Sequence, residues 1–136
     1  MLSKKTKYGI KALSYLARNK NSNLAKIAEI SEQEKIPLKF LESILLTLKR
    51  NGFLGAKKGQ KGGYYLLKSP DEILMVNVMR ILEGPIAMVP CVSLNFYEKC
   101  SDCPDEDLCV VHNLMIEVRD SSLQIFKNTS LADLIK

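Results

Sequence analysis

Apolar residues recur at every third or fourth position over most of the first fifty residues, which is the period of an amphipathic helix. The pattern predicts three helices. The first is capped by Ser3 and ends near Asn19, the second is capped by Asn23, and the third begins at Pro37 and stops at Asn51. The buried stripe of the second helix is predicted at Leu24, Ile27, Ala28 and Ile30, and that of the third at Leu38, Leu41, Leu45 and Leu48.

After Gly52 the pattern changes from helical to extended. The stretch from Phe53 to Lys57, the glycine-rich turn 59–63 and the run Tyr64–Leu67 together predict a β-hairpin. Three helices followed by a basic hairpin are typical of a winged helix-turn-helix, so residues 1–68 are predicted to form one DNA-binding region.

Residues 69–90 are predicted to form a connecting helix and linker. The stretch from Ser69 to Glu72 has the form of a capping box, and a short helix is expected from about Val76 to Glu83, before Gly84. From 86 to 104 the periodicity is weak, which indicates a loop organised by something other than its own core.

From 104 to 128 the chain is compatible with one long helix, with Pro104 in its first turn and three acidic residues behind it. Taken from 105, the helix would be about 36 Å long, more than the shorter helices can cover, which favours a dimerisation helix over packing within one subunit. Its predicted seam has the spacing of a heptad and consists of Leu108, Val111, Met115, Val118, Ser122 and Ile125. Residues 129–136 are predicted to be a C-terminal tail.

The charge of the chain is unevenly distributed. A length of 136 residues excludes large multidomain enzymes, and the net charge is +5. Residues 1–68 carry 15 Lys and Arg against 4 Asp and Glu, a net +11, whereas residues 69–136 carry 5 against 11, a net −6. The basic half predicts an anionic partner such as nucleic acid, and the acidic half must have another role.

The third helix and the hairpin suit double-stranded DNA, because a helix fits the major groove and a basic hairpin fits beside phosphates or in the minor groove. A solvated lysine-rich surface is the alternative. Three glycines permit positive φ and close backbone approach to the DNA, and Glu42 would either accept a hydrogen bond from cytosine or pair with a lysine. The candidate contacts are Lys39, Phe40, Glu42, Ser43 and Thr47 on the helix and Lys57, Lys58, Gly59, Lys61, Gly62 and Gly63 on the hairpin.

All four cysteines lie between Cys91 and Cys109, inside the acidic half. No secretory signal and no run of about 20 apolar residues is visible, so we expect a cytoplasmic protein with no membrane partner. In a reducing compartment clustered cysteines indicate a metal or redox site more often than disulfides, although two disulfides are the alternative.

Residues 91–112 hold five potential metal ligands, which are Cys91, Cys100, Cys103, Cys109 and His112. Cys109 and His112 lie three apart on the predicted helix and share a face, and Cys100 and Cys103 form a CxxC before it. Zinc would take these two pairs, whereas an iron–sulfur cluster would draw on four thiolates, with His112 as an alternative nitrogen ligand. His112 could also be an ordinary residue near the seam.

Catalysis is not expected. A CxxC oxidoreductase would need a thioredoxin-like alternation of strands and helices, and the pattern shows none. With one histidine, no grouping of nucleophile, base and acid is recognisable.

Several segments together resemble one known family. They are YGIKALSYLA, KIPLKFLESILLTLKRNGFL, KKGQKGGYYL and TSLADL, with the CxxxxxCxxH that runs from Cys103 to His112. Over nearly its whole length the chain is similar to the bacterial winged-helix iron–sulfur regulators, the Rrf2-type family that includes IscR and NsrR. The resemblance implies a mainly α fold with a small β-hairpin, in which a winged helix-turn-helix domain precedes a long C-terminal dimerisation helix.

The resemblance also implies a homodimer on a palindromic double-stranded DNA operator and a [2Fe–2S] cluster whose state controls binding. By position, Lys39 and Ser43 belong to the base-reading helix, Glu42 matches a specificity-setting glutamate, and Lys58 stands where the family usually has a wing arginine. The implied cluster ligands are Cys91, Cys103 and Cys109, with Cys100 or His112 as the fourth, because Cys91 lies farther from Cys103 than in the family and Cys100 is additional.

These observations lead us to expect a transcriptional repressor that senses iron–sulfur status, redox state or nitric oxide. The alternative is a winged-helix DNA-binding protein with a structural zinc site or no functional metal.

Overall fold

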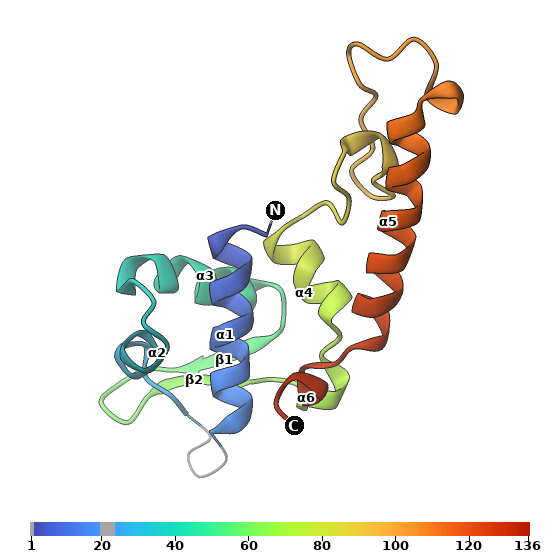
Figure 1. Ribbon diagram of the computed structural model, residues 1–136. Coiled ribbons are helices and arrows are strands. Elements are labelled where there is room, and N and C mark those ends of the chain that lie inside the picture. The colour runs from blue at the N-terminus through green and yellow to red at the C-terminus, as the bar shows by residue number, and fades with distance from the viewer. Residues whose placement is uncertain (1, 20–23) are drawn as a thin grey trace.

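The computed structural model describes residues 2–19 and 24–136, and Figure 1 shows a helical head with one long helix lying along its side. In chain order the elements are α1 (Lys4–Arg18), α2 (Ile27–Glu34), α3 (Leu38–Arg50), β1 (Leu54–Lys57), β2 (Gly63–Leu66), α4 (Met75–Leu82), α5 (Val110–Asn128) and α6 (Leu131–Leu134), with the 3₁₀ turns η1 (Pro70–Glu72), η2 (Pro90–Val92) and η3 (Glu106–Leu108). The mainly helical fold with a small β-hairpin is confirmed. We call residues 2–19 and 24–83 together with α6 the head, and residues 86–128 the arm.

The three predicted helices of the head are present. Ser3 caps α1, because its Oγ accepts the backbone N–H of Thr6 at 3.2 Å. On α3 the predicted core residues Leu41, Leu45 and Leu48 are fully buried, and so is Ile44. Leu38 was expected in that stripe but is 45% exposed, because it is the first residue of α3 and lies at the margin of the core.

The turn between α2 and α3 contains a left-handed residue. Lys35 ends α2 with φ 55°, the one positive φ outside glycine in the described residues. Ile36 then turns inward and is 2% exposed. On α2 itself Ile30 is buried as predicted, whereas Ala28 is exposed, because this short helix turns only the face of Ile30 toward α1 and α3. The predicted cap at Asn23 lies outside the described residues.

The hairpin is antiparallel, with Leu54 opposite Leu66 and Lys57 opposite Gly63. It is also fastened to the segment before α2. The N–H of Ala25 donates to the carbonyl of Tyr64 at 2.9 Å, and the N–H of Tyr64 donates back at 2.8 Å. This extra bridge fixes the position of the hairpin relative to α2 and α3.

The predicted capping box at Ser69 does not form. The Ser69 hydroxyl donates to the carboxylates of Asp71 at 2.5 Å and Glu72 at 2.8 Å, so these residues make the separate turn η1. The connecting helix is confirmed as α4, and Gly84 follows it with φ 92°.

Residues 129–136, which were predicted as a tail, return to the head. The N–H of Met75 donates to Thr129 O and the N–H of Leu131 donates to Ile73 O, both at 2.8 Å. Leu131 is fully buried in the core of the head, and a capping box between Ser130 and Asp133 begins α6. The arm is therefore connected to the head at both of its ends, through α4 and through α6 (Figure 1).

A carboxylate joins the start of α1 to the end of α4. Glu83 accepts hydrogen bonds from Ser3 N–H at 3.2 Å, from the Ser3 hydroxyl at 2.6 Å and from the hydroxyl of the fully buried Thr6. Partial burial of Glu83 opposes its ionisation, but these hydrogen bonds outweigh that effect and lower its pKa. The contact fixes the end of α4 to the start of α1, immediately before the arm begins.

The long helix is shorter than predicted. α5 begins at Val110 rather than near Pro104, because residues 106–108 form η3 and Asp105 caps that turn instead. Its 19 residues span about 28 Å rather than 36 Å. Of the predicted seam, Leu108 lies outside α5 and is 80% exposed, Val111 and Ile125 are also exposed, and the other three are half-buried.

Candidate DNA-binding face and cysteine pocket

The outer face of α3 presents both charged and hydroxyl side chains. Lys39, Glu42 and Ser43 are exposed, as the sequence predicts for a reading face. Ser43 donates its hydroxyl hydrogen to Phe40 O at 2.8 Å, and Thr47 donates to Ser43 O at 3.0 Å. Both hydroxyls therefore offer acceptor lone pairs to the outside, while Lys39 offers donors and Glu42 acceptors.

Phe40 and Thr47 lie toward the edges of this face. The ring of Phe40 packs edge-on against Tyr8 of α1, with ring centroids 5.7 Å apart, although 39% of the residue stays exposed. Thr47 is half-buried. Phe40 therefore both supports the angle between α1 and α3 and borders the exposed surface.

The hairpin carries its lysines at the tip, where Lys57, Lys58 and Lys61 are exposed together with Gly59. Gly59 has φ 100°, so the prediction of a positive φ is confirmed there. The prediction is wrong for Gly62. That residue is glycine because a Cβ would lie 2.1 Å from the carbonyl oxygen of Lys57.

Gly63 is explained by packing inside the protein as well. A Cβ at this position would meet the backbone of Ala25 at 2.7 Å, in the bridge that fixes the hairpin. The close approach at Gly62 and Gly63 is therefore made by the chain's own backbone, and Gly59 stays the glycine whose backbone faces outward.

The second candidate site is a pocket of about 590 Å³ at the far end of the arm, which we call the cysteine pocket. Its lining comes from the loop after α4, from η3 and from the start of α5. All five predicted ligands line it, namely Cys91, Cys100, Cys103, Cys109 and His112. Cys91 is buried and the other four are half-buried. All four cysteines are free thiols, so the alternative of two disulfides is not formed.

Two close contacts bring the loop and the helix together in this pocket. Nδ1 of His112 lies 3.3 Å from Sγ of Cys91, although 20 residues separate them in the chain. Cys109 is the N-cap of α5, and its Sγ accepts the backbone N–H of His112 at 3.4 Å. The predicted pairing of Cys109 with His112 is thus made by a helix cap rather than by two residues within the helix.

Thiols in the pocket disfavour one another's ionisation. Desolvation raises the pKa of Cys100, and the charge and hydrogen bond of Cys91 raise it further. Desolvation and then the charge of Cys109 raise the pKa of Cys103, against the lowering effect of a hydrogen bond from the Asp105 backbone. A bound cation would relieve this repulsion, and because it displaces thiol protons its affinity would rise with pH.

Comparison with known proteins identifies the family. The sequence profile of the Rrf2 family, described as iron-dependent transcriptional regulators, matches residues 2–136. The chain belongs to the Rrf2 family. It is accordingly a helix-turn-helix transcriptional regulator and not an enzyme, as the sequence predicts.

Relatives of this Rrf2-family chain match along its full length. It is 37% identical to a protein of Rhodobacter capsulatus named as an rrf2-like HTH-type transcriptional regulator, over 99% of this chain and 92% of that protein. It is 27% identical to the regulator IscR of Cronobacter sakazakii, over 98% of this chain and 79% of that protein. CymR, the global cysteine regulator of B. subtilis, matches with a TM-score of 0.80 at 27% identity, over 99% of this chain and 95% of CymR.

The cysteine pocket of this Rrf2-family protein fits an iron–sulfur cluster by the chemistry of its donors. Four thiols and one imidazole face one space, and a [2Fe–2S] cluster takes two such ligands on each iron. In the part of the chain that the structure describes, no three His, Cys, Asp or Glu side chains converge on a single metal position. Neither a tetrahedral zinc site nor a complete cluster site is therefore preformed, and the close ligand pair that is present is Cys91 with His112.

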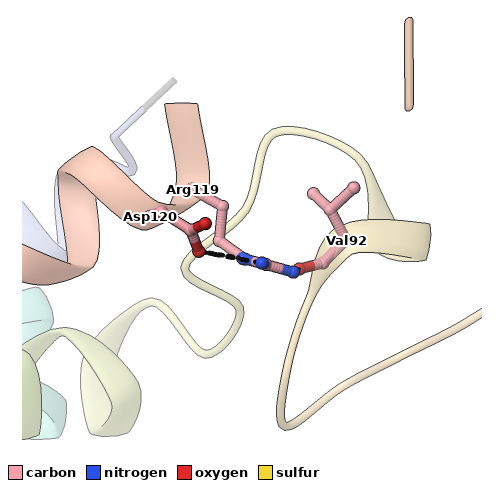
Figure 2. A network of polar contacts seen from close by, with 3 residues as sticks. All are labelled: Val92, Arg119 and Asp120. Carbon is pink, nitrogen blue, oxygen red and sulfur yellow. Dashed lines mark hydrogen bonds and ion pairs between the residues drawn. The ribbon is translucent and has the colours of Figure 1, made fainter. Parts of the chain in front are cut away.

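Two contacts that organise the cysteine pocket had no signal in the sequence. Figure 2 shows that Arg119 of α5 reaches the loop, where its Nη1 donates to Val92 O at 2.9 Å. The hydroxyl of Tyr97 donates to Glu106 of η3, which raises the pKa of Tyr97 to about 12. Both join segments that are remote in the chain, so no local spacing predicts them.

In the part of the chain that the structure covers, no helix combines the length and apolar character needed to cross a lipid bilayer.

Proposed function

We propose that this Rrf2-family regulator is a homodimeric repressor whose affinity for a palindromic operator is controlled by a [2Fe–2S] cluster in the cysteine pocket. The observation that carries the proposal is the gathering of all five predicted ligands around one pocket at the end of the arm. We assign Cys91, Cys103 and Cys109 as ligands, with Cys100 or His112 as the fourth. Such a cluster would supply a group that is sensitive to iron supply, redox state or nitric oxide.

The head supplies the DNA-binding surface. Residues 1–68 carry the net charge of +11, and exposed lysines lie on α3 and at the tip of the hairpin, as well as on α1 and at both ends of α2. In this proposal α3 enters the major groove, where Lys39 and Ser43 contact bases and Glu42 selects cytosine. Lys58 approaches the phosphates or the minor groove as a point charge, because lysine lacks the planar fork of arginine.

The arm supplies the dimer contact. Apolar side chains are exposed on α5, including Val111, Leu114 and Ile125 at 50%, 54% and 64%. A second copy of α5 would remove these side chains from water, and the two heads would then be held at a fixed separation, as a palindromic operator requires.

The cysteine pocket borders this dimer helix, so that a change in the pocket would alter DNA binding through α5. Cys109 caps α5 and His112 lies in its first turn, so any ordering of the loop acts directly on the end of the helix. A ligand that favours one arrangement of the loop shifts the population of arm conformations, and through them the placement of the two heads.

Metal content tests the proposal most directly. Protein purified without oxygen is expected to contain iron and acid-labile sulfide in equal amounts and to absorb in the visible range. Cys103→Ala should lose most of this absorption, while Ser101→Ala, a change at an exposed neighbour, should keep it. Zinc without visible absorption would replace the sensor with a structural metal site.

Binding to DNA is tested with a duplex selected from a random-sequence pool. Affinity should fall steeply with added salt, and Lys58→Ala should weaken binding to most sequences and reduce the salt slope by about one. Lys99→Ala removes an exposed lysine of the arm and should leave binding unchanged. Operator affinity that does not change on loss of the cluster would indicate a DNA-binding module without sensing. Affinity that does not change with salt would contradict the DNA-binding model itself.

A further inference from the structure

The turn η2, which carries Cys91, is held by α5 at two points. At the first, His112 Nδ1 lies 3.3 Å from Cys91 Sγ. At the second, Nη1 of Arg119 donates to the carbonyl of Val92 at 2.9 Å, as Figure 2 shows. His112 and Arg119 are seven residues apart, which is two helical turns, so both contacts are made from the same face of α5.

The guanidinium of Arg119 is held in a fixed orientation. Its side chain is 16% exposed, and a charged group so placed must be hydrogen-bonded. One oxygen of Asp120 accepts from Nε at 2.9 Å and from Nη2 at 2.8 Å, which leaves Nη1 aimed at the loop. The carboxylate is 60% exposed, so the ion pair itself contributes little to stability and acts by orienting the donor.

The acceptor of this bond lies in a buried turn. Cys91, Val92 and Ser93 are 8%, 1% and 4% exposed, and the turn is closed by the N–H of Ser93 donating to Pro90 O at 3.1 Å. Without Arg119, the Val92 carbonyl would have to find water, because a buried acceptor without a donor is costly. The turn would then lift from α5 and expose Cys91.

We propose that Arg119 is a positioning residue that fastens η2 to α5 and thereby sets how far Cys91 is exposed. The inference rests on the proposed function for the role of Cys91 as a ligand, but the contact is a property of the chain alone. A ligand held in place before binding loses less conformational freedom when it binds, so Arg119 prepares one corner of the cysteine pocket.

Thiol accessibility in reduced, metal-free, full-length protein tests this assignment. The four cysteines are alkylated with N-ethylmaleimide, and each is followed separately by mass spectrometry of its peptide. In Arg119→Met the rate at Cys91 should rise about tenfold, the factor expected for loss of one hydrogen bond from a charged donor. The rates at Cys103 and Cys109 should stay within about twofold, because Arg119 does not hold their segments. Cys100 is followed as well but is not a control, because Cys91 hydrogen-bonds with it.

Two further variants complete the test. Lys127→Met removes an exposed cation of the same helix and should leave the Cys91 rate unchanged. Arg119→Lys keeps the charge without the planar fork of the guanidinium, and an intermediate rate at Cys91 is expected. It replaces Arg119→Met as the test variant if circular dichroism shows that Arg119→Met does not fold. A wild-type rate at Cys91 in Arg119→Lys and in folded Arg119→Met would overturn the assignment, as would equal acceleration of all four cysteines.

The outcome is separable from that of the proposed function. No metal is present in the assay, so the alkylation result stands whether or not the purified protein holds a cluster. Conversely, the purified protein could hold a cluster while the Cys91 rate of the metal-free form is the same with and without Arg119. That result would refute the positioning role alone.

Discussion

Replacing Glu83 with glutamine tests the contact between the head and the start of the arm. The carboxylate accepts from two donors of Ser3 and from the hydroxyl of Thr6. A hydrogen bond to a charged acceptor is worth about 1 kcal/mol more than one to a neutral acceptor. The amide costs less to desolvate than the carboxylate, which offsets part of the loss added over these hydrogen bonds. We expect Glu83→Gln to lower the free energy of unfolding by about 2 kcal/mol, and Tm by about 6–8 °C.

The stability difference between wild type and Glu83→Gln should depend on pH. Because the pKa of Glu83 is lowered in the folded protein, its contribution is complete at pH values above its ordinary pKa of 4.5. The contribution is lost as the pH falls through the folded-state pKa. The difference in stability between wild type and Glu83→Gln should therefore be full at pH 7 and should shrink steadily in acid.

Urea unfolding followed by circular dichroism from pH 7 down to pH 3 measures this difference, at one fixed protein concentration because dimerisation would shift the midpoint. Glu117→Gln, at an exposed position on α5, is the matched control and should change stability by less than about 0.5 kcal/mol. A Glu83→Gln protein as stable as wild type at pH 7, or a difference that does not depend on pH, would refute the reasoning.

Two backbone predictions can be made with the same measurement. Lys35→Gly should stabilise the protein by about 1 kcal/mol, because φ 55° strains a residue with a Cβ, whereas Lys35→Ala keeps the strain and should bring no such gain. Gly62→Ala should cost about 1–3 kcal/mol and weaken DNA binding, since its Cβ would meet the Lys57 carbonyl at 2.1 Å and displace the tip of the hairpin; unchanged stability would show that the turn relaxes freely.

Local pattern predicts the elements of the head well, because each helix there has a strong apolar stripe and a clear end. Ser3 and Asn51 mark helix boundaries by chemistry that acts within one turn. The same kind of signal was misleading at Ser69, where two carboxylates compete for the hydroxyl. It was also misleading at Pro104, because Asp105 caps η3 rather than α5.

The candidate site was predictable in its residues but not in its construction. Spacing alone identifies Cys109 and His112 as neighbours, since any helix start brings positions three apart together. The approach of Cys91 to His112 depends on how the loop folds back on α5, and that is fixed by tertiary contacts such as the one from Arg119. Likewise, the sequence around Gly63 is typical of a flexible turn, whereas the position requires glycine because a Cβ would meet the backbone of Ala25.

The return of α6 to the head has a consequence for how the protein is made. Leu131 fills a buried position in the core that α1 begins, so the head closes across almost the entire length of the chain. Ribosomes deliver the N-terminal residues first, and contacts between distant segments form last. The DNA-binding surface therefore gains its final support after the cysteine-bearing segment has been synthesised, and a chain that stops within the arm lacks the Leu131 side chain that completes the core of the head.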